Sequence, residues 1–152
     1  MSDHPNSDGL KIWPQTAPSK CLVILMDLKI KLFKSFEGSY YLIVIAQGKV
    51  DSAALKRMFA EVEKITEPLL HCKVFIDLEA ASLNVRPAAV HAIVTQLKVH
   101  SISNLGKIVV VSSEFDRCVP LQLLRDLLCS RGFRVAVFDN TTKAAEWLSE
   151  AT

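Results

Sequence analysis

The spacing of hydrophobic residues changes several times along the chain, and the first change predicts a hairpin. Between residues 22 and 36, lysines alternate with apolar residues in the stretch KIKL at 29–32. This period of two is typical of an extended strand. The residues EGS at 37–39 favour a turn, and YYLIVIAQGKV at 40–50 follows as a second apolar strand.

Beyond residue 50, segments with helical spacing alternate with short apolar runs. Asp51 or Ser52 suits the N-cap of a first helix that ends at Pro68. The apolar residues of this helix recur at helical spacing, namely Leu55, Met58, Phe59, Val62 and Ile65. The run KVFIDL at 73–78 then predicts a buried strand.

Three further helices are expected, separated by the strands KIVVVSS and FRVAVFDN. Pro87 suits the first position of one helix, with Gly106 just beyond its frayed end. Another helix begins near Pro120, and Asn140 or Thr141 caps the last one. The predicted order is therefore β-β-α-β-α-β-α-β-α.

This order predicts an α/β fold with a mostly parallel sheet, because strands that alternate with helices pair through right-handed crossovers. The first strand would be an antiparallel edge, where Lys29 and Lys31 would prevent sheet-to-sheet aggregation. The other strands are apolar on both faces, so both faces of the sheet should be covered. With helices mainly on one face, we expect the segment around Trp13 and residues 22–26, or a second subunit, to cover the other.

The composition indicates one domain and excludes several classes of partner. The chain has 152 residues, of which 50% are hydrophobic and 22% charged, as in a compact globular domain. We expect a flexible N-terminal arm at 1–20 and a single domain at 21–152. A net charge of +2 without a basic cluster argues against nucleic acid. A polar N-terminus and short apolar runs predict no signal peptide, no membrane span and a cytoplasmic location.

Cysteine and histidine spacing predicts neither a metal site nor a cofactor. The four cysteines form no C-x-x-C pair, which suits a reducing compartment. The four histidines lack metal-ligand spacing, and we interpret none of them as locally paired with a carboxylate or nucleophile. Nucleotide-binding loops, nucleophile elbows and H-E-x-x-H motifs are all missing. An enzyme that uses the strand-end loops therefore ranks as the third hypothesis.

The element order and several stretches resemble the STAS superfamily, the fold of bacterial anti-sigma factor antagonists, and in particular its SpoIIAA-like branch. These stretches are GKVDSAALKRMF, VFIDL, KIVVVSS and VFDNTTKAAEWLSEA. The resemblance covers about residues 27–151. It implies a regulatory or protein-interaction module of bacterial type without a cofactor, related in fold to CRAL-TRIO lipid-exchange domains.

The sequence departs from that family at the position of its regulatory phosphorylation. Phosphorylated antagonists carry a serine or threonine in a D-S-[SG]-G-type motif after the "IDL" strand, where a phosphate meets a helix N-terminus. Here the chain reads SLNVRP at 82–87, with Ser82 two residues too early and Pro87 lacking an N–H group. We interpret the phospho-switch as lost and Ser82 as a turn residue.

Ligands of open α/β sheets bind at the carboxyl ends of the strands, which directs attention to four loops: 47–52, 79–86, 112–116 and 139–142. The ligand or partner candidates there are Ser82, Asn84, Arg86, Ser112, Ser113, Asn140 and Thr141. Most have a structural alternative, since Ser113 and Asp116 match a capping box and Asn140 or Thr141 a helix cap. Arg86 is the exception, because an arginine there has no required structural role and suits a carboxylate or phosphate.

The helix PLQLLRDLLCSRG has a broader apolar arc than one contact with a sheet requires. Leu121, Leu124 and Leu128 form the expected core stripe, and a second ridge comprises Val119, Leu123 and Leu127. A neighbouring helix could cover this ridge. Otherwise it is an interface for a protein partner or for a homodimer.

Two main hypotheses about function follow, and they belong to different classes. The first is a non-enzymatic module that acts through protein contacts and lacks the switch serine. The second is a small carrier that holds an apolar, lipid-like molecule between the helices and the sheet.

Overall fold

The computed structural model describes residues 20–25 and 28–150, and side chains from residue 28 onward. The elements are β1 (Lys20–Leu25), β2 (Leu28–Lys34), β3 (Tyr40–Val50), α2 (Ser52–Thr66), β4 (Cys72–Leu83), α3 (Pro87–Gln96), α4 (Ser101–Asn104), β5 (Leu105–Val111), the 3-10 turn η2 (Phe115–Arg117), α5 (Val119–Ser130), β6 (Val135–Phe138) and α6 (Thr141–Ser149). The predicted arm at 1–20 lies almost wholly outside the described residues.

The strands form one six-stranded sheet in the order β1-β2-β3-β4-β5-β6. The first three strands pair antiparallel, and β3 to β6 pair in parallel. The predicted α/β class, with a mostly parallel sheet and an antiparallel edge strand, is therefore confirmed.

The first predicted strand is in fact two strands. The stretch 22–36 is divided between β1 and β2, which pair antiparallel, and one strand of that length would have been unusually long. Lys29 and Lys31 lie in β2, which has a partner on each side. Their interpretation as edge-strand charges is therefore wrong, because β1 is the edge. It also follows that residues 22–25 extend the sheet.

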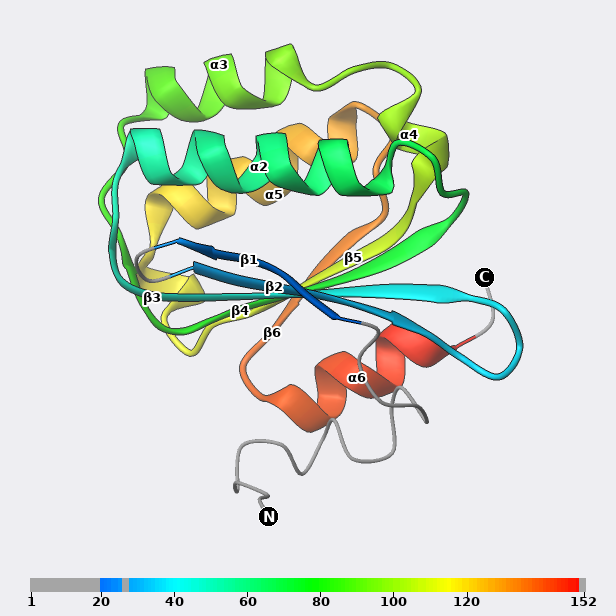
Figure 1. The fold of residues 1–152 in the computed structure, drawn as a ribbon. Coiled ribbons are helices and arrows are strands. Elements are labelled where there is room, and N and C mark those ends of the chain that lie inside the picture. The colour runs from blue at the N-terminus through cyan, green and yellow to red at the C-terminus, as the bar shows by residue number, and fades with distance from the viewer. Residues whose placement is uncertain (1–19, 26–27, 151–152) are drawn as a thin grey trace.

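Helices lie on both faces of the sheet (Figure 1). The helices α2, α3 and α5 cover one face, and α6 lies on the other. The first core includes Leu55, Val90 and Leu121 from these three helices. The second joins Val109 of β5 to Leu148 of α6. The last helix thus covers part of the face for which we expected the N-terminal segment or a second subunit.

Two further boundaries differ from the prediction. The strand predicted at 73–78 continues to Leu83, because β3 extends far enough to pair with it up to Val50. The segment after Pro87 is two helices, since α3 ends at Gln96 and the short α4 follows. Gly106 lies inside β5 and not beyond a helix end.

Candidate functional site

The carboxyl ends of β3 to β6 lie along one edge of the sheet, because parallel strands all end on the same side. Each end leads directly into the next turn or helix on that edge (Figure 1). This arrangement places the sequence-predicted candidates of four separate loops along one edge, which we call the carboxyl edge.

Ser82, Asn84 and Arg86 are all exposed at the end of β4. Ser82 lies within β4 and pairs with Lys49 of β3, so its interpretation as a turn residue is wrong. The backbone N–H of Asn84 donates to the Val50 carbonyl at 2.9 Å. Arg86 precedes α3 and its side chain makes no capping hydrogen bond. The backbones of Ser82 and Asn84 are thus held by β3, and all three side chains point to solvent as candidates for contact.

Among the candidates that follow β5 and β6, Ser112 and Asn140 make side-chain hydrogen bonds to nearby backbone. The Ser112 hydroxyl accepts a hydrogen bond from the Glu114 N–H at 3.2 Å. The capping box predicted for Ser113 does not form, because η2 begins after Glu114 without a side-chain cap, and Ser113 remains exposed. Asn140 caps α6 as predicted, since its Oδ1 accepts the Lys143 N–H at 2.8 Å.

Thr141 is the first residue of α6 and is half-buried. It is therefore placed in the helix that Asn140 caps, and it remains a candidate by position on the carboxyl edge.

The second apolar ridge of α5 is only partly available to a partner. Leu123 and Leu127 are half-buried and pack against the first core, and α5 contacts α3. Val119 is different, because it is 62% exposed at the start of the helix. Of the three residues predicted to form an interface, Val119 therefore remains the candidate for contact with a partner, and it lies on the carboxyl edge.

A pocket of about 350 Å³ opens beside the end of β3. Its residues come from the start of β2, the end of β3 and the first turns of α2, namely Leu28, Ala46, Gln47, Lys49, Val50, Asp51, Ala53, Ala54, Arg57 and Met58. The loop 47–52 was among the strand-end loops that the sequence indicated. The contributions of Leu28, Arg57 and Met58 had no sequence signal, because they depend on how β2 and α2 lie beside β3.

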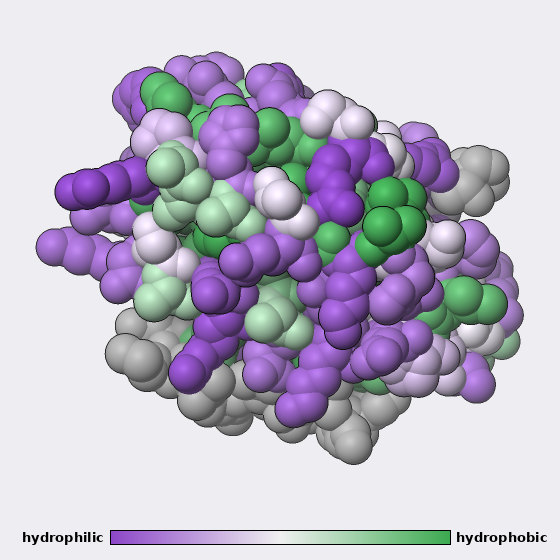
Figure 2. All heavy atoms as spheres, turned by 90° about the horizontal axis from the view of Figure 1, so that it is seen from above, coloured by the Kyte–Doolittle hydropathy of each residue, from purple (hydrophilic) through white to green (hydrophobic). Residues whose placement is uncertain are grey.

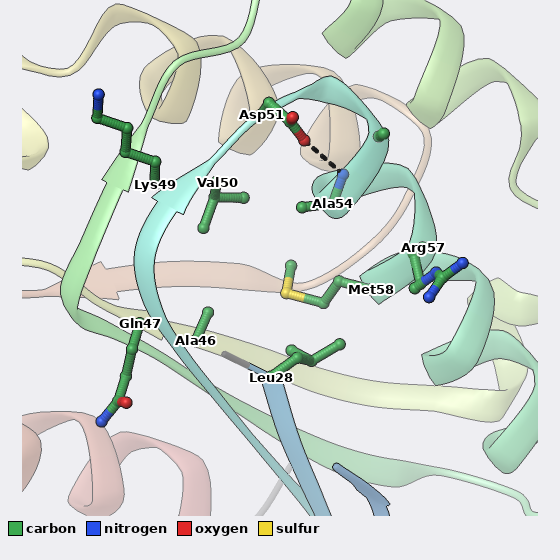
Figure 3. A pocket seen from close by; sticks show the side chains of 10 residues that line it. Leu28, Ala46, Gln47, Lys49, Val50, Asp51, Ala54, Arg57 and Met58 are labelled. Carbon is green, nitrogen blue, oxygen red and sulfur yellow. Dashed lines mark hydrogen bonds between the residues drawn. The ribbon is translucent and has the colours of Figure 1, made fainter. Parts of the chain in front are cut away.

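Apolar side chains converge on this pocket and polar ones stand at its edge (Figure 3). Leu28, Ala46 and Met58 face one another, whereas Gln47 and Lys49 point away. The Asp51 carboxylate accepts the Ala54 N–H at 2.9 Å and thereby caps α2. Chemically, the arrangement suits a molecule with an apolar body.

A buried lysine outside the pocket links β5 to α6. Lys107 is 1% exposed, and its Nζ donates to the carbonyls of Trp147 at 2.8 Å and Glu150 at 3.0 Å. The same Nζ lies 4.8 Å from the centre of the Trp147 ring. Lys107 thus satisfies carbonyl groups at the C-terminus of α6. Lys107 was not among the candidates predicted from the sequence, although a lysine within an otherwise apolar strand is visible there.

Burial shifts the pKa of two groups in the core. It lowers the pKa of the Lys107 ammonium, and nearby Arg134 and Lys73 lower it further, while Glu150 acts in the opposite direction. Burial also raises the pKa of the Cys72 thiol to about 12, so this thiol is protonated at neutral pH.

Within residues 28–150, no group of three or more His, Cys, Asp and Glu side chains is arranged to hold a metal ion. None of the helices that the structure describes is long and apolar enough to cross a membrane.

Comparison with solved structures identifies a SpoIIAA-like fold. An uncharacterised protein of the DUF3478 family from Shewanella loihica PV-4, described as having a SpoIIAA-like fold, matches with a TM-score of 0.55 at 14% sequence identity. The match covers 85% of this chain and 99% of that one. A match to EndoMS in its apo form has a TM-score of 0.34 at 9% identity, over 91% of this chain and 48% of that one. No family model and no curated protein matches the sequence.

Proposed function

We propose that this chain is a non-enzymatic regulatory module that acts through protein contacts made at the carboxyl edge. The observation that carries the proposal is the exposure of Val119 and Arg86 there. Val119 is 62% exposed at the start of a helix whose leucines pack inward, and the Arg86 side chain makes no capping hydrogen bond. The two residues follow adjacent strands, β4 and β5, on this edge, and arginine is enriched at protein interfaces.

The face of the molecule formed by α2, α3 and α5 is a less favourable surface for such contacts. Seen from above, this face is largely polar, and its apolar side chains reach the surface in separate small groups (Figure 2). A partner would therefore find no single large apolar patch on this side. This distribution supports placing the contact at the carboxyl edge, where Val119 lies.

We also propose that the module works without the regulatory phosphorylation that is found in the family it resembles. Ser82 lies in β4, before the end of the strand, and Pro87 is the first residue of α3. A phosphate on Ser82 would be several residues from the helix start, where free N–H groups favour an anion. Intact-mass measurement of the denatured protein from its native cells should accordingly show no added phosphoryl group.

A matched pair of valines tests the interface. Val119 and Val99 are both strongly exposed, at 62% and 77%, but Val99 follows α3 at the opposite edge of the sheet. A photo-crosslinking amino acid placed at position 119 in living cells should give a discrete product that is missing with position 99. Equal products at both positions, or no product at position 119, would contradict the proposal.

A second function, that of a small-molecule carrier, is favoured by the pocket beside β3. Its volume of about 350 Å³ falls in the range of small-ligand sites. Native mass spectrometry of the purified chain should then reveal extra mass that is lost on denaturation. A bare chain under both conditions, after incubation with small apolar compounds, would count against a carrier.

A further inference from the structure

We propose that the pocket between β2, β3 and α2 binds a small amphipathic carboxylate, whose apolar body fills the pocket and whose anionic group pairs with Arg57. The inference rests on the second of the two functions proposed above, the carrier, and names the class of its ligand. It is carried by the pocket's size, by the residues of its walls and by the charges at its edge.

The size of the pocket limits the ligand to a small molecule. Its volume is about 350 Å³, roughly twice that of the 150 Å³ cavity that holds one benzene molecule in an engineered protein. A body equivalent to about two rings therefore fits, such as a fused bicyclic ring. A two-chain lipid is too large to be enclosed.

The walls of the pocket belong to the hydrophobic core. Met58 is 2% exposed, Ala46 4% and Val50 5%, and all three are members of the first core cluster. Leu28 packs against the same cluster from β2. An apolar ligand that reaches these side chains is removed from water, which is the main source of its binding free energy.

The charges at the edge favour an anion over a cation or a neutral head group. Arg57 is exposed beside Met58 on α2, and it makes no ion pair with any residue that the structure describes. Asp51 is the one carboxylate of the lining residues, and it already accepts the Ala54 N–H as the cap of α2. A guanidinium offers a planar pair of donors that matches a carboxylate.

The chain offers matched variants for a direct test. Arg57→Gln removes the charge at the pocket, and Lys56→Gln removes a charge from the adjacent exposed residue, which does not line it. Ala53→Phe fills the pocket from an exposed position on α2, so the core need not repack. Circular dichroism and the thermal midpoint establish that each variant is folded.

The probes are 2-naphthoate and its neutral analogue 2-naphthamide, titrated calorimetrically into the full chain at neutral pH. We expect naphthoate to bind about tenfold more tightly than the amide, with that advantage lost in Arg57→Gln and kept in Lys56→Gln. Ala53→Phe should abolish binding of both. In the wild type, the methyl resonance of Met58 should shift on addition of naphthoate.

Each other outcome has a distinct meaning. If both probes bind equally and Arg57→Gln changes nothing, the carboxylate inference is wrong while the carrier function stands. If neither probe binds and Met58 does not shift, the inference and the carrier function both fail. If naphthoate binding depends on Arg57 but survives Ala53→Phe, the anion binds to surface charge and the pocket assignment is overturned.

Discussion

Replacing Lys107 by methionine tests whether this buried lysine holds α6 against the sheet. The substitution keeps a flexible side chain of similar length but removes the ammonium group. The carbonyls of Trp147 and Glu150 then lose the donor that lies 2.8 and 3.0 Å away. The packing of the side-chain stem is largely preserved, so the measured effect reports mainly on the charge and its hydrogen bonds.

The expected effect is a difference between two opposing contributions. Hydrogen bonds from a charged donor contribute about 1.5–3 kcal/mol each, and a cation at a helix C-terminus about 0.3–1 kcal/mol. Together they amount to roughly 3–7 kcal/mol. Burying an ammonium costs several kcal/mol, which methionine avoids. We expect a net loss of about 2 kcal/mol, or about 4–8 °C in Tm for a chain of this size.

Thermal and urea unfolding of Lys107→Met against the wild type measure this loss, and hydrogen exchange of the α6 amides locates it. Lys143→Met is the control, because Lys143 is an exposed residue of the same helix and should change stability by less than about 0.5 kcal/mol. An unchanged or higher Tm for Lys107→Met would refute the reasoning, since the cost of burial would then exceed what the hydrogen bonds return.

The remaining predictions concern alkaline stability and four other residues. The folded-state pKa of Lys107 lies below its usual 10.5, so the unfolded chain binds more protons between these two values and the unfolding free energy rises with pH there. The difference in unfolding free energy between the wild type and Lys107→Met should therefore grow with pH in that window. A difference that shrinks would mean that the pKa is shifted in the opposite direction. In Gly106→Ala the new Cβ would lie 3.1 Å from the His71 carbonyl oxygen, and urea unfolding should show a loss of about 1–3 kcal/mol, whereas no loss would mean that the backbone yields easily. Iodoacetamide at neutral pH should label exposed Cys129 in the folded chain and buried Cys72 only after unfolding, as read by peptide mass spectrometry; early labelling of Cys72 would contradict its burial. Asp51→Ala should lower the unfolding free energy by about 1 kcal/mol through loss of the α2 cap, whereas Asp51→Asn should stay close to the wild type. Equal stability of the wild type and both variants would show that this cap does not stabilise the protein.

Features set by nearby residues could be predicted from the sequence. Asp51 and Asn140 cap their helices as expected, because an N-cap depends on a side chain and an N–H group three residues apart. The alternation of strands and helices likewise follows from local hydrophobic spacing. The parallel order then determined that the predicted loops would share the carboxyl edge.

Features set by pairing partners could not be predicted in this way. The end of β4 at Leu83 depends on the length of β3, and the division of residues 22–36 depends on a reversal of the chain. Both segments have the alternating composition of a strand, and nothing in their own sequence shows where pairing stops. The capping box predicted at Ser113 is absent for a related reason. In the turn before η2, the Glu114 N–H donates to the Ser112 hydroxyl instead.

The pocket was only partly visible in the sequence. The loop 47–52 was indicated by its position after a strand, but Met58 and Leu28 are ordinary apolar residues in their own elements. Their side chains face a common space because α2 crosses β3 next to the start of β2. Lys107 shows the opposite situation, since its position in an apolar strand was a signal whose partner, the end of α6, lies about forty residues later.

The strand order β1 to β6 follows the chain without a single exchange, and this has a consequence for how the protein is made. Each strand can join the sheet as soon as it leaves the ribosome, because its neighbour has already been synthesised. The helix α6 emerges after all six described strands, yet it packs on Val109 and Phe75 of the central strands. A nascent chain stalled before residue 141 would therefore expose apolar surface that a chaperone can recognise.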